Sequence, residues 1–243
     1  MEPTNIGNLG PSAFARLMAG VTQKQQQGIG PGPVDDEPTP DEPGHPEYHR
    51  RRRAEWNLKR WETATPPRYR RADATHPAVQ QWADNVAADP DTAGSLLLTG
   101  TTGTGKTYEA YGALHRIAAA GSTHPYEIRA ITAADMYGLL RPKGSDRGME
   151  EELRRLVKVP LLLLDDLGAA KGSEWTEDVT GRLINERYNK CRPTIYTSNL
   201  PARAANGAPD LTSALGERIV SRLSEDTRVV AMTGTDRRRR GAA

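Results

Sequence analysis

The stretch GTTGTGKT at residues 100–107 directly follows the apolar run SLLLT at residues 95–99. It fits the phosphate-loop pattern G-x-x-x-x-G-K-[ST], in the strand-before, helix-after context that the pattern requires. Its glycines allow the backbone to curl so that successive N–H groups point inward at phosphate oxygens. The helix predicted to follow adds the positive end of its dipole. We therefore expect a nucleoside triphosphate site here.

Two side chains of this stretch have specific expected roles. Lys106 reaches the β- and γ-phosphates, and Thr107 ligates Mg²⁺. ATP and Mg²⁺ are therefore the predicted cofactors. The predicted nucleotide-binding residues of the loop and the following helix are Gly100, Thr101, Thr102, Gly103, Thr104, Gly105, Lys106, Thr107 and Tyr108.

A second apolar run, LLLLDD at residues 161–166, ends in two adjacent carboxylates. Ligands of open α/β sheets bind at the carboxyl ends of the strands, which is where this pair lies. Asp165 is the predicted Mg²⁺ ligand, mostly through water, because Mg²⁺ keeps much of its hydration. Asp166 is predicted to point the other way and to orient or deprotonate the attacking water. An acidic turn after a strand is the alternative.

The rest of the chain alternates short apolar runs with helical periods. Strands are predicted at 95–99, 126–131, 159–166, 193–199 and 227–233, and helices at 48–62, 76–88, 106–120, 132–140, 149–157, 174–190 and 215–223. Such alternation predicts an α/β fold, with a parallel sheet covered by helices on both faces.

The N-terminal region differs in composition from the rest of the 243 residues. Residues 11–27 carry apolar side chains at helical spacing and are predicted to dock on a partner protein. The segment that follows is rich in proline, glycine and acids, which predicts a flexible linker. A disordered tail without a role is the alternative. We divide the chain into a docking helix with its acidic linker at 1–46, a basic helix at 47–65 and a nucleotide-binding domain at 66–243.

Charge is unevenly distributed, although the net charge is only +2. Residues 50–71 hold nine bases against two acids, which indicates a polyanionic partner. Single-strand binders combine cationic grooves with aromatic faces. Three candidate surfaces follow, each with ordinary solvated charge as its alternative: residues 50–53 with Trp56 and Trp61, the loop residues Arg141, Lys143 and Arg147, and the tail at 237–240.

The single cysteine, Cys191, excludes an internal disulfide and a thiolate zinc cluster, and is typical of a reducing compartment. No pattern of a secretory signal is found, and the longest apolar run, VPLLLL, is too short to span a bilayer. We therefore expect a cytoplasmic protein without a membrane partner.

Four segments carry a family pattern: LLLLDDLG from residue 161, LINERYNKCRPTIYTSNLP from 183, LGERIVSRL from 215 and MTGTDRRR from 232. They resemble the DnaC/DnaI/IstB group of AAA+ ATPases, which are replicative-helicase loaders and transposition helper proteins. The resemblance covers about residues 66–238. It implies the P-loop AAA+ (ASCE) fold, here without a C-terminal helical lid and with a flexible N-terminal extension.

The resemblance also implies roles for residues outside the loop. Asn199 corresponds to the sensor-1 residue, whose amide hydrogen-bonds the γ-phosphate or the attacking water; a turn residue is the alternative. Arg222, with Arg218 one helical turn away, corresponds to the arginine that reaches the ATP of a neighbouring subunit. An ATP-dependent homo-oligomer is therefore expected, with a solvated helix face as the alternative.

Two further residues follow from the same resemblance. The segment PPRY resembles the one that borders the adenine in this family, so Tyr69 or Pro67 is expected to contact the base; an extended entry into the domain is the alternative. Arg238 aligns with the sensor-2 arginine, but Arg237 replaces the tyrosine that precedes it in the family, so a basic tail is the alternative. Asp166 stands where many AAA+ ATPases have glutamate, and its shorter side chain predicts modest or partner-dependent hydrolysis.

The resemblance implies a helicase loader that binds single-stranded DNA and a replicative helicase. The alternative is a transposition helper that acts on duplex DNA with a transposase. A small-molecule P-loop kinase and a non-catalytic, ATP-gated adaptor are the remaining hypotheses.

Overall fold

The computed structural model describes residues 15–16, 18–19, 22–23, 38–142, 144–169, 173–204, 208–234 and 236. Most of the predicted docking helix and linker, together with Lys143 and residues 237–240, lies outside the described residues. Its contacts divide the chain into two units, residues 1–48 and 49–243. The described end of the first unit is a series of turns over 40–45, after which helix α2 (Pro46–Ala64) begins.

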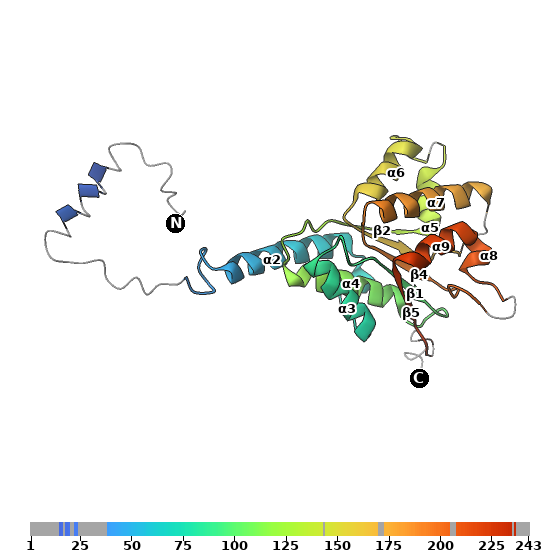
Figure 1. Ribbon diagram of the computed structural model, residues 1–243, viewed down its shortest axis with the longest axis horizontal. Helices are drawn as coiled ribbons and strands as arrows, with labels where there is room; N and C mark the ends of the chain where they lie inside the picture. The colour runs from blue at the N-terminus through green and yellow to red at the C-terminus, as the bar shows by residue number, and fades with distance from the viewer. Residues whose placement is uncertain are drawn as a thin grey trace. The chain divides into compact units, whose positions relative to one another are not determined.

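The second unit is built on a five-stranded parallel sheet in the order β2-β3-β4-β1-β5 (Figure 1). The strands are β1 (Ser95–Thr99), β2 (Ile128–Thr132), β3 (Leu161–Asp165), β4 (Thr194–Ser198) and β5 (Thr227–Ala231). Because β4 lies between β1 and β3, the segments that follow these three strands leave the sheet side by side. The phosphate loop, the acid pair and Asn199 therefore meet at the carboxyl ends of these strands.

Helices cover both faces of this sheet. On one face lie the later part of α2, α3 (Pro77–Ala88) and α4 (Lys106–Ala120), and on the other lie α5 (Ala133–Leu140), α6 (Met149–Lys158), α7 (Glu174–Asn189), α8 (Leu211–Leu215) and α9 (Glu217–Glu225). Side chains alternate across a strand, so Leu96 and Leu98 of β1 enter the first core and Leu97 enters the second. The predicted α/β fold with two covered faces is confirmed.

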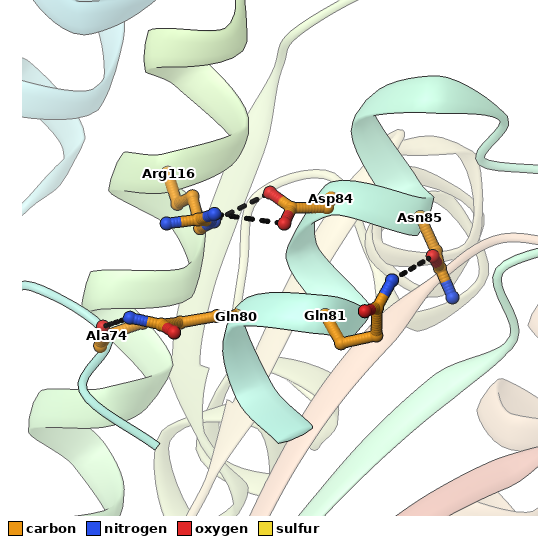
Figure 2. Close-up of polar contacts among 6 residues, drawn as sticks. All are labelled: Ala74, Gln80, Gln81, Asp84, Asn85 and Arg116. Carbon is orange, nitrogen blue, oxygen red and sulfur yellow. Dashed lines mark hydrogen bonds and ion pairs between the residues drawn. The ribbon is translucent and has the colours of Figure 1, made fainter. Parts of the chain in front are cut away.

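Polar contacts attach α3 to α4 (Figure 2). The guanidinium of Arg116 on α4 donates to both carboxylate oxygens of Asp84 on α3, over 2.6 and 2.9 Å, whereas Gln80 Nε2 of α3 donates to the carbonyl of Ala74 in the segment before α3, over 2.7 Å. Beneath these contacts, Val79, Trp82 and Val86 are buried on the inward face of α3. The ion pair and the apolar face of α3 therefore hold α3 against α4, the helix that begins where the phosphate loop ends.

One prediction differs in its bounds and one was wrong. The helix predicted at 215–223 is α9, which begins after Gly216 at φ 85, a conformation that favours glycine, and the short helix α8 before it was not predicted. Trp61, predicted to contact nucleic acid, is only 5% exposed, and its Nε1 donates to the carbonyl of Tyr111 over 3.2 Å. The indole belongs to the core because α2 packs against α4 through this face.

Two of the basic residues of α2 bind backbone groups within the fold. Arg50 and Arg53 donate to the carbonyls of Ala120 and Gly121, over 3.3 and 2.9 Å, at the C-terminal end of α4. Cations are favourable there because the helix dipole is negative at that end.

Among the residues described, no helix has the length and apolar character needed to cross a membrane.

Candidate active site

The carboxyl ends of β1, β3 and β4 surround a cavity of about 470 Å³. Most of the residues predicted from the sequence meet in it. The cavity is lined by Arg68, Tyr69, Thr102, Gly103, Gly105, Lys106, Thr107, Tyr108, Asp165, Asp166 and Asn199. Segments from four separate parts of the chain therefore build one concave site.

The loop at 100–107 needs glycine where its backbone is left-handed. Gly105, with φ 100, is the N-cap of α4, so its conformation aims the first N–H groups of the helix at the cavity. Gly103 has φ 87, and a Cβ at this position would clash with the carboxylate of Asp236. Glycine is therefore favoured at 105 by the left-handed backbone, and at 103 both by the left-handed backbone and by the close approach of Asp236.

Lys106 is only 6% exposed, and its ammonium lies against the loop. Nζ donates to the carbonyls of Gly100 and Thr101 over 2.7 and 2.9 Å, and to Oδ1 of Asn199 over 2.9 Å. Nδ2 of Asn199 donates in turn to Oδ1 of Asp166 over 3.4 Å. One amide thus links the loop cation to the second acid of the pair, across β4.

Asp165 lies between two hydroxyl groups. Thr107 Oγ1 donates to Oδ1 over 3.1 Å, and Thr197 Oγ1 donates to the same oxygen over 2.5 Å. Burial raises the pKa of the Asp165 carboxyl, and the neighbouring charge of Asp166 adds to the rise, while the bonds from Thr197 and Thr107 oppose it. A carboxylate that is costly to keep charged has a strong tendency to acquire a cation.

The donor set fits Mg²⁺. The Thr107 hydroxyl and the Asp165 carboxylate are hard oxygen donors beside each other on the cavity wall, and Mg²⁺ is usually held by one or two carboxylates together with substrate phosphates. In the part of the chain that the structure describes, no group of three or more histidine, cysteine or acidic residues forms a separate metal site.

No role was predicted for Thr197 from the sequence. Its hydroxyl also accepts the backbone N–H of Asp166 over 3.0 Å, and Asp166 has φ 56, which is unusual for a residue with a side chain. This threonine therefore fixes both acids. The spacing could have indicated this role: Thr197 lies two residues before Asn199, so in an extended segment both side chains point to the same side.

The wall of the cavity also has an aromatic part. Tyr69 belongs to a single 3-10 turn, η2 (Pro67–Tyr69), and its ring stacks on that of Tyr111 with centroids 4.7 Å apart and an interplanar angle of 12°. Burial, with a contribution from Asp165, raises the pKa of Tyr111 to about 12, so its hydroxyl stays protonated. The cavity thus runs from backbone N–H groups to a flat apolar surface.

A buried acid on α4, also missed from the sequence, holds the segment behind Tyr69. Glu109 has no exposed surface, and its carboxylate accepts the N–H of Thr75 over 2.9 Å, the N–H of His76 over 3.1 Å and the Thr75 hydroxyl. One residue before Glu109, the Tyr108 hydroxyl donates to the carbonyl of Arg71, and about one turn after it Gly112 allows the backbone at 73–74 to touch α4. The phosphate-loop helix and the aromatic wall are therefore one rigid part.

Both predicted arginines of α9 lie elsewhere. Arg218 and Arg222 are exposed and line a separate cavity of about 420 Å³ between α7 and α9. Arg222 is paired with Glu225 over 3.5 Å and lies over the ring of Tyr188. The structure does not bring either arginine to Asp166 within one chain. Arg238 lies outside the described residues.

Comparisons with known proteins agree with this geometry. The model of a family described as IstB-like ATP binding protein matches residues 74–242. The replicative helicase loader DnaI of Bacillus subtilis is 30% identical over 105 residues, which are 43% of this chain and 32% of that protein. An ATP-binding protein in an insertion sequence of Mycobacterium tuberculosis is 28% identical over 152 residues, which are 62% of this chain and 58% of that protein.

Among solved structures, the crystal structure of the DnaC helicase loader superimposes with a TM-score of 0.54 and 25% identity, covering 72% of this chain and 99% of that one. The chain spans less than two thirds of the length of the two sequence relatives above, 32% of one and 58% of the other.

Proposed function

The chain belongs to the family of IstB-like ATP binding proteins, and on that premise we propose that it hydrolyses ATP with Mg²⁺ as a DnaC-like helicase loader. The observation that carries the proposal is the convergence of Lys106, Thr107, Asp165 and Asn199 on one cavity. These four side chains come from the ends of three neighbouring strands, and each offers a group that a triphosphate or its metal ion requires.

Each residue has a distinct role in this proposal. The loop amides and Lys106 bind the phosphates, and Thr107 with Asp165 holds Mg²⁺, which neutralises the charge that develops on the phosphates. Asp166 orients the attacking water. Its oxygen is already bonded to Asn199, which also contacts Lys106. Asn199 is therefore suited to sense whether a γ-phosphate is present. Tyr69 borders the base.

The proposed site is completed by a second copy of the chain. Arg222, with Arg218, is exposed on α9 and does not line the nucleotide cavity of its own chain. An arginine supplied by a neighbouring subunit stabilises the charge of the transition state and contributes about 10³ to 10⁵ in rate. ATP-dependent assembly into a homo-oligomer follows from this arrangement.

The proposed partners are single-stranded DNA and a replicative helicase in the cytoplasm, with residues 1–46 as the docking segment, 47–65 as a basic helix and 66–243 as the ATPase domain. Similarity to a helicase loader over nearly the whole of its solved chain supports this assignment. A transposition helper acting on duplex DNA with a transposase is the second candidate. The relative from an insertion sequence favours it, because this chain covers 58% of that protein but only 32% of the helicase loader DnaI.

Hydrolysis and partner choice are tested separately. ATP turnover is measured with Mg²⁺, with and without single-stranded DNA, for the wild type and for Asp166→Asn. We expect turnover in the wild type and a loss of at least about tenfold in the variant, because the water is no longer oriented. Equal turnover in both proteins would remove Asp166 from the mechanism, and no turnover in either would favour an ATP-gated adaptor.

For the partner, the chain is mixed with the host's replicative helicase or with a transposase of the insertion-sequence type, with and without ATP. Co-migration with the helicase supports the loader. Co-migration with the transposase alone, together with a preference for duplex DNA, would replace it with the transposition helper.

A further inference from the structure

Trp56 is exposed to an unusual degree for an indole. All four tryptophans are described, and Trp56 on α2 is 62% exposed, whereas Trp61 and Trp82 are buried and Trp175 packs against Tyr137. Tryptophan is enriched at binding interfaces, because its indole offers a large apolar face together with a polar N–H. The indole of Trp56 is therefore a candidate binding surface.

A cavity lies beside this indole. It measures about 450 Å³ and is lined by residues of α2 and of the start of the edge strand β2: Trp56, Lys59, Arg60, Thr63, Ala64, Glu127 and Ile128. Arg60 is fixed in place, because its Nη1 donates to the carbonyl of Tyr126 over 2.9 Å and its guanidinium lies 5.7 Å from the centre of the Trp56 ring. Two flat groups, one cationic and one aromatic, thus face the same cavity in a preorganised arrangement.

The helix face around Trp56 is cationic. Arg52 and Arg60 lie four residues before and after Trp56, and Lys59 lies three residues after it, so all three flank the indole on one side of α2. Arg52 and Lys59 are exposed, in contrast to the role of Arg53 at the C-terminal end of α4. Cationic side chains on both sides of an aromatic face match a single strand, in which a base lies between two phosphates.

We propose that this cavity binds one unpaired base of single-stranded nucleic acid, which stacks on Trp56 while Lys59 and Arg52 contact the adjacent phosphates. The inference rests on the single-strand binding of the proposed function and names the place where it occurs. Three cationic side chains around the indole, Arg52, Lys59 and Arg60, against the one acid of the lining, Glu127, favour nucleic acid over an acid-poor peptide of a helicase, which is the other occupant that an exposed tryptophan could bind.

The test uses the full chain and a labelled oligothymidylate, with affinity and tryptophan emission measured together. Base stacking predicts that Trp56→Ala weakens binding by about 5- to 150-fold and that Trp56→Phe restores most of it. Oligothymidylate should quench the emission of the wild type but not that of Trp56→Phe. Lys59→Ala should lower the slope of log affinity against log salt by about 0.7, the value for one phosphate of a single strand.

The matched control is Val229→Ala, which trims another exposed apolar side chain on β5, at the opposite edge of the sheet from β2. It should leave affinity and quenching unchanged. Thermal unfolding of Trp56→Ala should stay close to that of the wild type, because the side chain is largely exposed.

The outcomes separate the two claims. If Trp56→Ala binds the oligonucleotide as tightly as the wild type, the stacking site is wrong while single-strand binding stands. A loss confined to Arg141→Ala or Arg147→Ala would move the site to the loop between α5 and α6. If Trp56→Ala keeps its DNA affinity but no longer co-migrates with the helicase, the occupant is a protein. Absence of DNA binding by the wild type would overturn both the stacking site and the DNA part of the proposed function.

Discussion

Replacement of Glu109 is the most informative perturbation of the nucleotide site, because this buried acid joins the phosphate-loop helix to the segment behind Tyr69. In Glu109→Ala the partly buried N–H groups of Thr75 and His76 lose an acceptor that is itself fully buried. A buried donor left without a partner costs about 1–3 kcal/mol. The two N–H groups, with the Thr75 hydroxyl, give an expected loss of about 3–5 kcal/mol in the free energy of unfolding.

A loss of that size is readily measured. In a chain of this length each kcal/mol lowers the midpoint of thermal unfolding by about 2–4 °C, so Glu109→Ala should unfold about 6–20 °C below the wild type. The matched control is Glu150→Ala, which removes a surface ion pair with Arg182 at 2.9 Å. Exposed pairs contribute about 0–1 kcal/mol, so this control should shift the midpoint by less than about 4 °C.

Glu109→Gln extends the test to function. The glutamine keeps one accepting oxygen and the side-chain volume, so the fold should survive while the wall carrying Tyr69 loosens. We expect a weaker affinity for ATP and an unchanged affinity for inorganic triphosphate, because only ATP reaches Tyr69. Midpoints for Glu109→Ala and Glu150→Ala that agree within about 2 °C would refute the reasoning.

Three further predictions follow from single contacts. Arg187 is fully buried and donates to the carbonyls of Leu156, Val159 and Pro193, so Arg187→Met should lower the unfolding free energy in urea by about 3–5 kcal/mol. The folded pKa of Asp165 is raised, so below its unfolded value this group adds stability that is lost as pH rises through the folded value. The nucleotide-free Asp165→Asn variant should therefore be at least as stable as the wild type at pH 7, and any advantage should shrink as the pH approaches 4; a variant clearly less stable at pH 7 would contradict this. Gly103→Ala, at φ 87, should cost about 1–2 kcal/mol in unfolding free energy and should weaken ATP binding in a titration.

Local chemistry made much of the site predictable from the sequence. A loop that binds phosphate through its backbone needs glycine at fixed places, and the segments after β1, β3 and β4 carry the residue types that the chemistry requires. The period of the apolar residues predicted most of the helices, because one buried face is enough to specify each of them. The prediction for Trp61 was wrong because its basic neighbours hid the face of α2 that packs on Tyr111.

What escaped prediction depends on contacts between distant segments. Glu109 binds backbone groups more than thirty residues earlier, and no local pattern marks a carboxylate for such partners. The order of the strands, which places Asn199 between the phosphate loop and the acid pair, is likewise a property of the whole sheet. The break between α8 and α9 rests on one glycine, Gly216, in a period that otherwise continues.

The central claim is that backbone amides of residues 100–107 and the ammonium of Lys106 bind the phosphates of ATP. It is tested most directly by calorimetric titration of the wild type and of Lys106→Ala with a non-hydrolysable ATP analogue in magnesium buffer, with Lys59→Ala as the control. We predict binding by the wild type and by Lys59→Ala, and a loss of at least about tenfold in Lys106→Ala, which lacks a charge-assisted bond to the phosphates. Equal affinity of all three proteins, or no binding by the wild type, would contradict the account.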